Sequence, residues 1–287
     1  MAEVKELIEA SKGVIRASEC HRELQGASKR EKRAITQCLR RCEKDGLLKK
    51  TGRVAGEYRI INTGLQEVDW KNSSIEDVKL TLPLGIHECV KFVPSSVVLI
   101  SGVTNAGKTA FAMSIAYLNW KRIETLYFTS EIGGHEFKTR VLAHSDIPSW
   151  EEIKMFNGFE SNELPDLIKP DALNIIDYLE PPAGDYTQVA TVMTDIQRAL
   201  KKGIAVICLQ KKEGDEYGAG GQFIKNKPHL SLTLDPVDYP VCRVTIRKAK
   251  AMQDGYRNPG GQSVDYKIDN DGVSIVPYGK FHFSKWR

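Results

Sequence analysis

The sequence has no apolar run of the roughly 18 residues needed to cross a membrane, because charged and polar residues interrupt every candidate stretch. Its first residues, MAEVKELIEASKG, lack the basic start and the apolar centre of a secretory signal peptide. Both absences argue against a membrane-spanning or secreted protein. We therefore expect a cytoplasmic protein with no membrane partner.

The sequence also has no C-x-x-C pair among its 6 cysteines. Cys38 and Cys42 stand one helical turn apart, and a zinc site could be imagined from them together with Cys20 and His21. The paired-ligand spacing of zinc sites is missing, however. Cys38 and Cys42 instead fall on the apolar face of a predicted helix, where cysteine acts as a small core residue. The cysteines therefore favour a reducing compartment.

Size and charge suggest two unequal domains. A chain of 287 residues predicts about two domains, and 41% hydrophobic with 27% charged residues is ordinary for a globular protein. The net charge is only +4, but Lys and Arg are concentrated in residues 1–60. We expect a small basic domain over residues 1–62, a linker over 63–84 and a larger domain over 85–287.

The basic segment has a readable plan. Ser28 to Glu31 form a capping box that starts a helix, and Gly46 is a natural stop for it. The apolar positions of this helix recur at i, i+3, i+4 and i+7, which predicts one buried stripe: Ile35, Cys38, Leu39 and Cys42. Shorter helices are expected upstream, and LLKKT and EYRII read as a β-hairpin joined by a Gly52–Gly56 turn.

This order of helices and hairpin resembles a winged-helix domain, which implies DNA contact. The helix face opposite the apolar stripe offers cations and amides suited to phosphates and base edges, and Arg53 lies in the expected wing. Thr36 lies on the same face, and the expected nucleic-acid residues of this domain are Lys29, Arg33, Gln37, Arg40 and Arg53. Two alternatives remain, a solvated basic face and a protein-binding module.

The larger domain contains the pattern Gly102-x-x-x-x-Gly107-Lys108-Thr109. The apolar run SVVLI (96–100) before it predicts a buried strand, and TAFAMSIAYLNWK (109–121) after it predicts a helix. A glycine-rich turn between a strand and a helix is the context that a phosphate-binding P-loop requires. The alternative is a glycine-rich turn with an idle lysine.

The physics of such a loop predicts ATP and Mg²⁺ as ligands. Glycines let successive N–H groups point at phosphate oxygens, and the helix N-terminus adds the positive end of its dipole. We expect Lys108 to neutralise the β- and γ-phosphates and the Thr109 hydroxyl to ligate Mg²⁺. The expected cofactor-binding residues are Gly102, Thr104, Asn105, Ala106, Gly107, Lys108, Thr109 and Ala110.

Two acids follow predicted strands further along the chain. IETLYFTSE (123–131) ends on Glu131, which could polarise the attacking water. ALNIIDYLE (172–180) contains Asp177, which could hold Mg²⁺ through a water molecule. Alternatively, Glu131 only caps a helix and Asp177 lies in a surface turn.

A third strand, GIAVICLQ (203–210), ends on Gln210, whose amide could sense the γ-phosphate. The glycine-rich segment 211–227 follows it and contains Lys225, which we expect to contact nucleic acid. The alternative for this segment is a surface loop without function.

Taken in order, the P-loop, Glu131, Asp177, Gln210 and the glycine-rich loop resemble the RecA-like core of RecA recombinases and DnaB-type helicases. The resemblance covers about residues 85–278. It implies an α/β fold with a twisted, mostly parallel sheet. It also implies that Lys248 and Lys250, in RKAK (247–250), reach the nucleotide of a neighbouring subunit as further catalytic groups beside Lys108, Glu131 and Gln210.

The same resemblance implies an ATP-dependent DNA helicase or translocase. We expect a homo-oligomer, in the form of a hexameric ring, with single-stranded DNA at the core and duplex DNA at the winged helix. A filament-forming recombinase or remodeller and a regulatory ATPase without motor activity are the alternatives. The resemblance further suggests a bacterial, phage or mobile-element protein.

Overall fold

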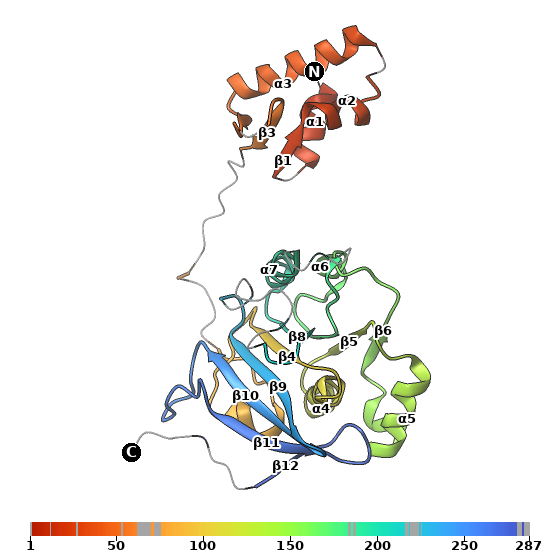
Figure 1. Ribbon diagram of the computed structural model, residues 1–287, viewed down its shortest axis with the longest axis vertical. Coiled ribbons are helices and arrows are strands. Elements are labelled where there is room, and N and C mark those ends of the chain that lie inside the picture. Colours follow the sequence, from red (N-terminus) through yellow and green to blue (C-terminus); the bar gives the residue numbers. More distant parts are fainter. Residues whose placement is uncertain are drawn as a thin grey trace. The chain divides into compact units, whose positions relative to one another are not determined.

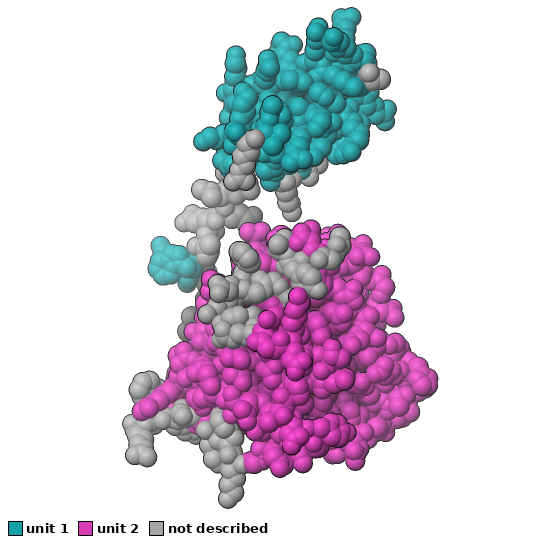
Figure 2. Space-filling model, viewed as in Figure 1, with its two compact units in different colours: residues 1–73 teal, residues 74–287 magenta. Residues whose placement is uncertain are grey.

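The structure is a computed structural model. It describes residues 2–11, 13–26, 28–52, 54–61, 70–71, 76–182, 188–215 and 226–279, together with residues 185, 218, 224 and 283. The chain separates into two compact units, residues 1–73 and 74–287 (Figure 2). Each unit has its own hydrophobic core.

The first unit combines helices with a small antiparallel sheet. Its elements are α1 (Ala2–Ala10), β1 (Val14–Arg16), α2 (Ala17–Glu23), α3 (Lys29–Lys44), β2 (Leu48–Lys50) and β3 (Glu57–Ile60). The strands lie in the order β1-β3-β2, and both pairings are antiparallel. The short strand β1 was not predicted, because three residues carry no readable period. The winged-helix assignment of this unit stays a prediction.

Helix α3 forms as its sequence predicts. The Ser28 hydroxyl accepts a hydrogen bond from the Glu31 amide at 3.1 Å, and the Glu31 carboxylate accepts one from the Ser28 amide at 2.8 Å. This reciprocal pair satisfies two of the donors that a helix start leaves open. Leu39 and Cys42 are buried in the core of the unit, so the predicted stripe faces inward.

The second unit is built on one large mixed sheet. Within the described residues, the 9-stranded sheet has the order β12-β11-β10-β9-β4-β8-β7-β5-β6 (Figure 1). Its strands are β4 (Val97–Gly102), β5 (Thr125–Thr129), β6 (Lys154–Phe156), β7 (Leu173–Asp177), β8 (Ile204–Gln210), β9 (Leu230–Asp238), β10 (Val241–Ala249), β11 (Ser263–Ile268) and β12 (Ile275–Pro277). Neighbouring strands from β9 to β6 are parallel, and β9 to β12 form an antiparallel meander. The predicted mostly parallel α/β sheet is confirmed.

Helices cover both faces of the central strands. The helical elements are η1 (Pro83–Glu88), α4 (Lys108–Asn119), α5 (Gly134–His144), η2 (Ile147–Trp150), α6 (Leu164–Leu167) and α7 (Val189–Ala199). Val98 and Ile100 of β4 pack in the cluster that contains α4, whereas Val97 and Leu99 pack in the cluster that contains α6 and α7. Burial on both faces explains why β4 reads as a continuous apolar run.

The packed part of the second unit begins earlier than the predicted boundary at residue 85. Leu80 and Leu82, which we had assigned to the linker, are buried in the α4 cluster. The Thr81 amide and carbonyl each bond the Asn119 side chain at 2.8 Å. Residues 76–84 therefore belong to the larger unit, because their alternate side chains cover its core.

All 6 cysteines are free thiols, and Cys20 and Cys42 are buried in the first unit. In the described part of the chain, no cluster of three His, Cys, Asp or Glu side chains is arranged to hold a metal. No helix there has the length and apolar character needed to cross a membrane.

Candidate functional site

The turn between β4 and α4 is the predicted phosphate-binding loop, and it contains two residues of left-handed backbone conformation. Asn105 (φ 64°) and Gly107 (φ 82°) are left-handed, a conformation that glycine adopts without strain. A Cβ atom at Gly107 would also lie 2.4 Å from Cδ1 of Ile268, so a side chain there would require Ile268 to shift in addition to the backbone strain. The Lys108 ammonium donates to the Val103 carbonyl at 3.0 Å, inside the curl of the loop.

This loop forms one wall of a cleft of about 550 Å³. Six of the predicted cofactor-binding residues line the cleft: Thr104, Asn105, Gly107, Lys108, Thr109 and Ala110. Gly102 and Ala106 do not line it, because both are buried behind the loop. The Ala106 carbonyl accepts a hydrogen bond from the Tyr266 hydroxyl at 2.7 Å, which ties the loop to β11.

Glu131 and Gln210 enter the same cleft from two other strands. Glu131 follows β5, where its amide bonds the Thr129 hydroxyl at 3.3 Å. Gln210 ends β8 directly beside Gly102 and donates to the Thr104 hydroxyl at 2.9 Å. Because parallel strands present their carboxyl ends at one edge of a sheet, residues about 100 positions apart converge here.

Asp177 lies at the end of β7 and is fully buried behind the cleft. Its Oδ2 atom accepts a hydrogen bond from the Tyr127 hydroxyl at 2.7 Å, whereas Oδ1 has no hydrogen-bond partner among the described residues. Burial raises the pKa of Asp177 overall, although the Tyr127 and Thr109 hydroxyls near the carboxylate act in the opposite direction. An unsatisfied carboxylate oxygen beside the Thr109 hydroxyl is an arrangement that fits a hydrated Mg²⁺ ion.

Lys108 is the buried cation of the site. Burial lowers the pKa of Lys108, and the charges of Glu131 and Asp177 act in the opposite direction. The ammonium donates to a neutral backbone carbonyl and forms no salt bridge with the described residues, so it can form an ion pair with a bound anion. At the P-loop, the cleft therefore offers a cation to a bound phosphate, while the carboxylates of Glu131, Glu136 and Asp271 line other parts of it.

Lys248 and Lys250 lie at the other end of the sheet. Ala249 pairs with Leu230, which pairs with Val98 near the start of β4, whereas Gly102 at the end of β4 pairs with Leu234. Four residues of strand separate the two levels by roughly 13 Å. Neither lysine lines the cleft, and the Lys248 ammonium donates to the Asn226 carbonyl at 2.9 Å.

Positive charge is crowded at this far end. Burial, Lys250 and Lys248 together lower the pKa of His229 to about 4, so its imidazole is neutral near pH 7. Burial and Lys250 also lower the pKa of Lys248. The end of β10 is therefore a cationic position remote from the P-loop of its own chain.

The predicted nucleic-acid residues on α3 lie on one surface. A hollow of about 510 Å³ along α3 is lined by His21, Lys29, Lys32, Arg33, Thr36, Gln37 and Arg40. His21 Nε2 lies 3.0 Å from the Thr36 hydroxyl, which joins α2 to α3 beside the cations. Arg53 and Lys225 lie outside the described residues.

Sequence reasoning missed a second wall of the cleft. Its residues come from α5 and the residues just before it, and from the end of β11 and the turn after it: Ile132, Glu136, Thr139, Arg140, Ala143, Ile268, Asn270, Asp271 and Gly272. The segment Asn270-Asp271-Gly272 between two apolar stretches is a hairpin signal that could have located the turn. Its position over the P-loop depends on the pairing of β11 with β10, which no local pattern specifies.

Comparison with known proteins identifies the fold. No protein-family model and no curated protein matches the sequence. A KaiC-like protein from the hyperthermophilic archaeon Pyrococcus horikoshii is similar in structure, with a TM-score of 0.55, 16% identity and coverage of 72% of this chain and 100% of that one. The RadB recombinase aligns with a TM-score of 0.49, 12% identity and coverage of 63% and 90%. The larger unit therefore has the fold of RecA-like P-loop ATPases.

Proposed function

We propose that the chain is a Mg²⁺-dependent ATPase whose hydrolysis drives a DNA helicase or translocase. The observation that carries the ATPase proposal is the convergence of Lys108, Glu131 and Gln210 on one cleft, with the buried Oδ1 of Asp177 behind it. Each of these groups has a different part in phosphoryl transfer.

In the proposed reaction the loop amides and Lys108 bind the β- and γ-phosphates. Mg²⁺ held by Thr109 and, through water, by Asp177 would offset charge on the transferred group. Glu131 orients a water molecule in line with the γ-phosphorus and accepts its proton. The new bond joins the water oxygen to phosphorus, and the bond to the leaving oxygen of ADP breaks. Gln210 senses the loss of the γ-phosphate and alters the position of segment 211–227, which follows it in the chain.

The position of Lys248 and Lys250 supports an oligomer with shared sites. Both lysines are too far along the sheet to reach the cleft of their own chain. A neighbouring chain could present them to it, where they would add charge to stabilise the transition state. A closed ring, which we propose to be a hexamer, gives every cleft such a neighbour.

The cationic side of α3 supports DNA as the partner. Lys29, Arg33, Gln37 and Arg40 are exposed on one side of a helix whose opposite side is buried. Lysine and arginine contacts to phosphates would give sequence-independent, salt-sensitive affinity. In this proposal the first unit holds duplex DNA, and segment 211–227 meets a single strand at the ring axis.

A subunit-mixing experiment tests the shared ATPase site. Lys250→Ala should bind ATP but hydrolyse it poorly, since a cation supplied in trans can contribute up to about 10³-fold in rate. Glu131→Gln should also bind and fail to hydrolyse. Mixed hexamers should regain activity, because some interfaces combine an intact Glu131 with an intact Lys250.

The measurement is steady-state ATPase across mixing ratios with DNA present, after native mass spectrometry has verified subunit exchange. Activity of either variant alone sets the baseline. A wild-type chain without ATPase activity would refute the proposed ATPase function. Active wild-type protein with no rescue at any ratio would instead refute the shared site.

A further inference from the structure

A partly buried hydrogen-bonded cluster joins the end of α5 to the turn after β11. His144 Nδ1 lies 2.8 Å from Asp271 Oδ2, and the Ser274 hydroxyl lies 3.1 Å from the same nitrogen and bonds the same carboxylate oxygen. The Asp271 Oδ1 atom accepts the amides of Val273 at 2.8 Å and Ser274 at 2.7 Å. One carboxylate therefore closes the turn and holds the helix.

The ionisation of Asp271 fixes the direction of its hydrogen bond with His144. Burial would raise the pKa of Asp271, but hydrogen bonds from Ser274, His144 and the Val273 amide hold it well below the usual range. The carboxylate is therefore ionised at neutral pH and only accepts hydrogen bonds. His144 Nδ1 must be the donor, which assigns the proton to that nitrogen.

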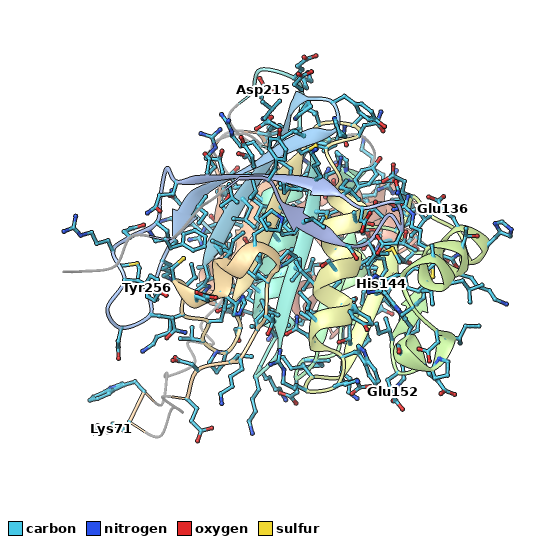
Figure 3. The ribbon with its side chains drawn as sticks, turned by 90° about the horizontal axis from the view of Figure 1, so that it is seen from below. Lys71, Glu136, His144, Glu152, Asp215 and Tyr256 are labelled. Carbon is cyan, nitrogen blue, oxygen red and sulfur yellow. The ribbon has the colours of Figure 1, made fainter. Side chains whose placement is uncertain are left out.

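Aromatic side chains keep the His144 ring in this orientation. The Tyr117 ring meets it edge to face at 4.5 Å between centroids, and the Trp150 ring does so at 5.7 Å. The Trp150 indole is itself fixed by a bond from Nε1 to the Ser145 hydroxyl at 2.9 Å. Figure 3 shows His144 on the side of α5 that faces α4, whereas Glu136 lies at the other end of α5.

The two joined elements are the second wall of the cleft. Arg140 of α5 makes a further, longer contact to the Gly272 carbonyl at 3.4 Å. At the start of the turn, Ile268 packs against Gly107 of the P-loop. The P-loop takes the phosphates in the proposed function, so the α5 wall is left to face the nucleoside.

We propose that His144 is a positioning residue for this wall. Through Asp271 it holds α5 and residues 268–274 in one arrangement, and thereby sets the affinity for the nucleoside part of ATP. The inference rests on the proposed ATPase function, because it takes the ligand to be a nucleotide. It does not place His144 in contact with the ligand, and it assigns it no part in the chemical step.

The test variant is His144→Leu, which keeps most of the volume and removes the donor. Losing one hydrogen bond to a partly buried charge should weaken binding of a non-hydrolysable ATP analogue by about tenfold. In ATPase assays, His144→Leu should raise KM relative to the wild type and leave kcat within about twofold. The lost binding energy is the same in the ground state and the transition state, so only KM changes. Binding of inorganic tripolyphosphate, which contacts the P-loop alone, should not change.

Two controls separate positioning from general damage. His144→Asn should restore affinity, because its side-chain amide nitrogen lies close to the position of Nδ1. His135→Gln removes an exposed histidine from the same helix and should behave as wild type. Asp271→Asn offers a second route if His144→Leu fails to fold, since it keeps an acceptor for the turn amides.

Isothermal titration calorimetry with both ligands gives the affinities, and hydrogen exchange at Val273 and Ser274 reports whether the turn is held. Faster exchange with unchanged ATP-analogue affinity would overturn the proposal, because the cluster would then be structural only. Equal weakening of tripolyphosphate would overturn it too. A wild-type chain that binds tripolyphosphate but no nucleotide analogue would refute the nucleoside wall, whereas one that binds neither would refute the ATPase and the positioning role together.

Discussion

Helices α3 and α4 both begin with a lysine, but their first turns are opposite in design. Before Lys29, the Ser28 side chain caps the helix and Glu31 stands in the first turn. Before Lys108, Gly107 offers no side-chain cap, and the first turn has no acidic residue. At the start of α3, Ser28 accepts from a free backbone amide and Glu31 offsets the positive end of the helix dipole. At the start of α4 no side chain of the cap or first turn does either, so the amides and the dipole are available to a ligand.

Along their sides, in contrast, α3 is the more open of the two helices and α4 the more enclosed. Helix α3 buries Leu39 and Cys42 and exposes cations along its free side, whereas α4 is buried over most of its length. An anion held at a helix end needs a rigid helix, which deep burial provides. A long partner such as DNA needs an open helix side. In the proposed function, the phosphate would therefore lie at the start of α4, whereas DNA would lie along the exposed side of α3.

The largest expected effect comes from replacing Lys108, the first residue of α4, with alanine. Lys108→Ala removes the buried cation of the cleft, and ATPase activity should fall by at least about 100-fold. Lys29→Ala is the matched control, since it removes the first lysine of a helix with a satisfied N-terminus, and ATPase activity should not change. Steady-state assays of phosphate release measure both. Retained activity in Lys108→Ala would remove the distinction between the two helix starts.

A smaller effect is expected along the side of α3. Reversing Arg33 and Arg40 to Glu should weaken duplex DNA binding at moderate salt by roughly tenfold or more, and should reduce the slope of log affinity against log salt by about two. Fluorescence anisotropy across a salt series measures both quantities. The double variant Lys5→Glu, Lys138→Glu changes the net charge equally at other exposed positions. Equal losses in the two double variants would assign DNA binding to net charge, not to α3.

The elements that the sequence predicts best are those whose local pattern agrees with their burial. The run before Gly102 is apolar because β4 is covered on both faces, and the capping box at Ser28 is a purely local arrangement. Strand β9 was missed although Leu230, Leu232 and Leu234 alternate with polar residues, a period that could have revealed it. Strand β6 has only three residues at a sheet edge, too few for any period.

Sequence predicts the residues of the site at the P-loop motif and at the ends of strands. Glu131, Asp177 and Gln210 each follow an apolar run, and parallel pairing brings such ends together. The wall formed by α5 and the turn near Asp271 depends on side chains 127 positions apart. Their contact requires the antiparallel meander to return over the P-loop, and the sequence contains no local signal of that return.

The smallest expected effect concerns the cap that distinguishes α3 from α4. Ser28→Ala removes the acceptor for the Glu31 amide, a bond of 3.1 Å, while the Glu31 carboxylate can still accept the Ser28 amide. Loss of an N-cap side chain costs about 1 kcal/mol of helix stability. If exchange requires unfolding of the first unit, amides in the middle of α3 should exchange about fivefold faster. Hydrogen exchange of the full chain, followed by mass spectrometry, measures this directly.

Ser28→Thr is the matched control for that experiment, because its hydroxyl can still accept from the Glu31 amide and exchange should stay close to wild type. ATPase activity should be unchanged in both variants, since the cap stabilises a helix remote in sequence from the cleft. Unchanged exchange in Ser28→Ala would mean that tertiary packing of Leu39 and Cys42 alone holds α3. The contrast with α4 would then lie in the sides of the two helices and not in their first turns.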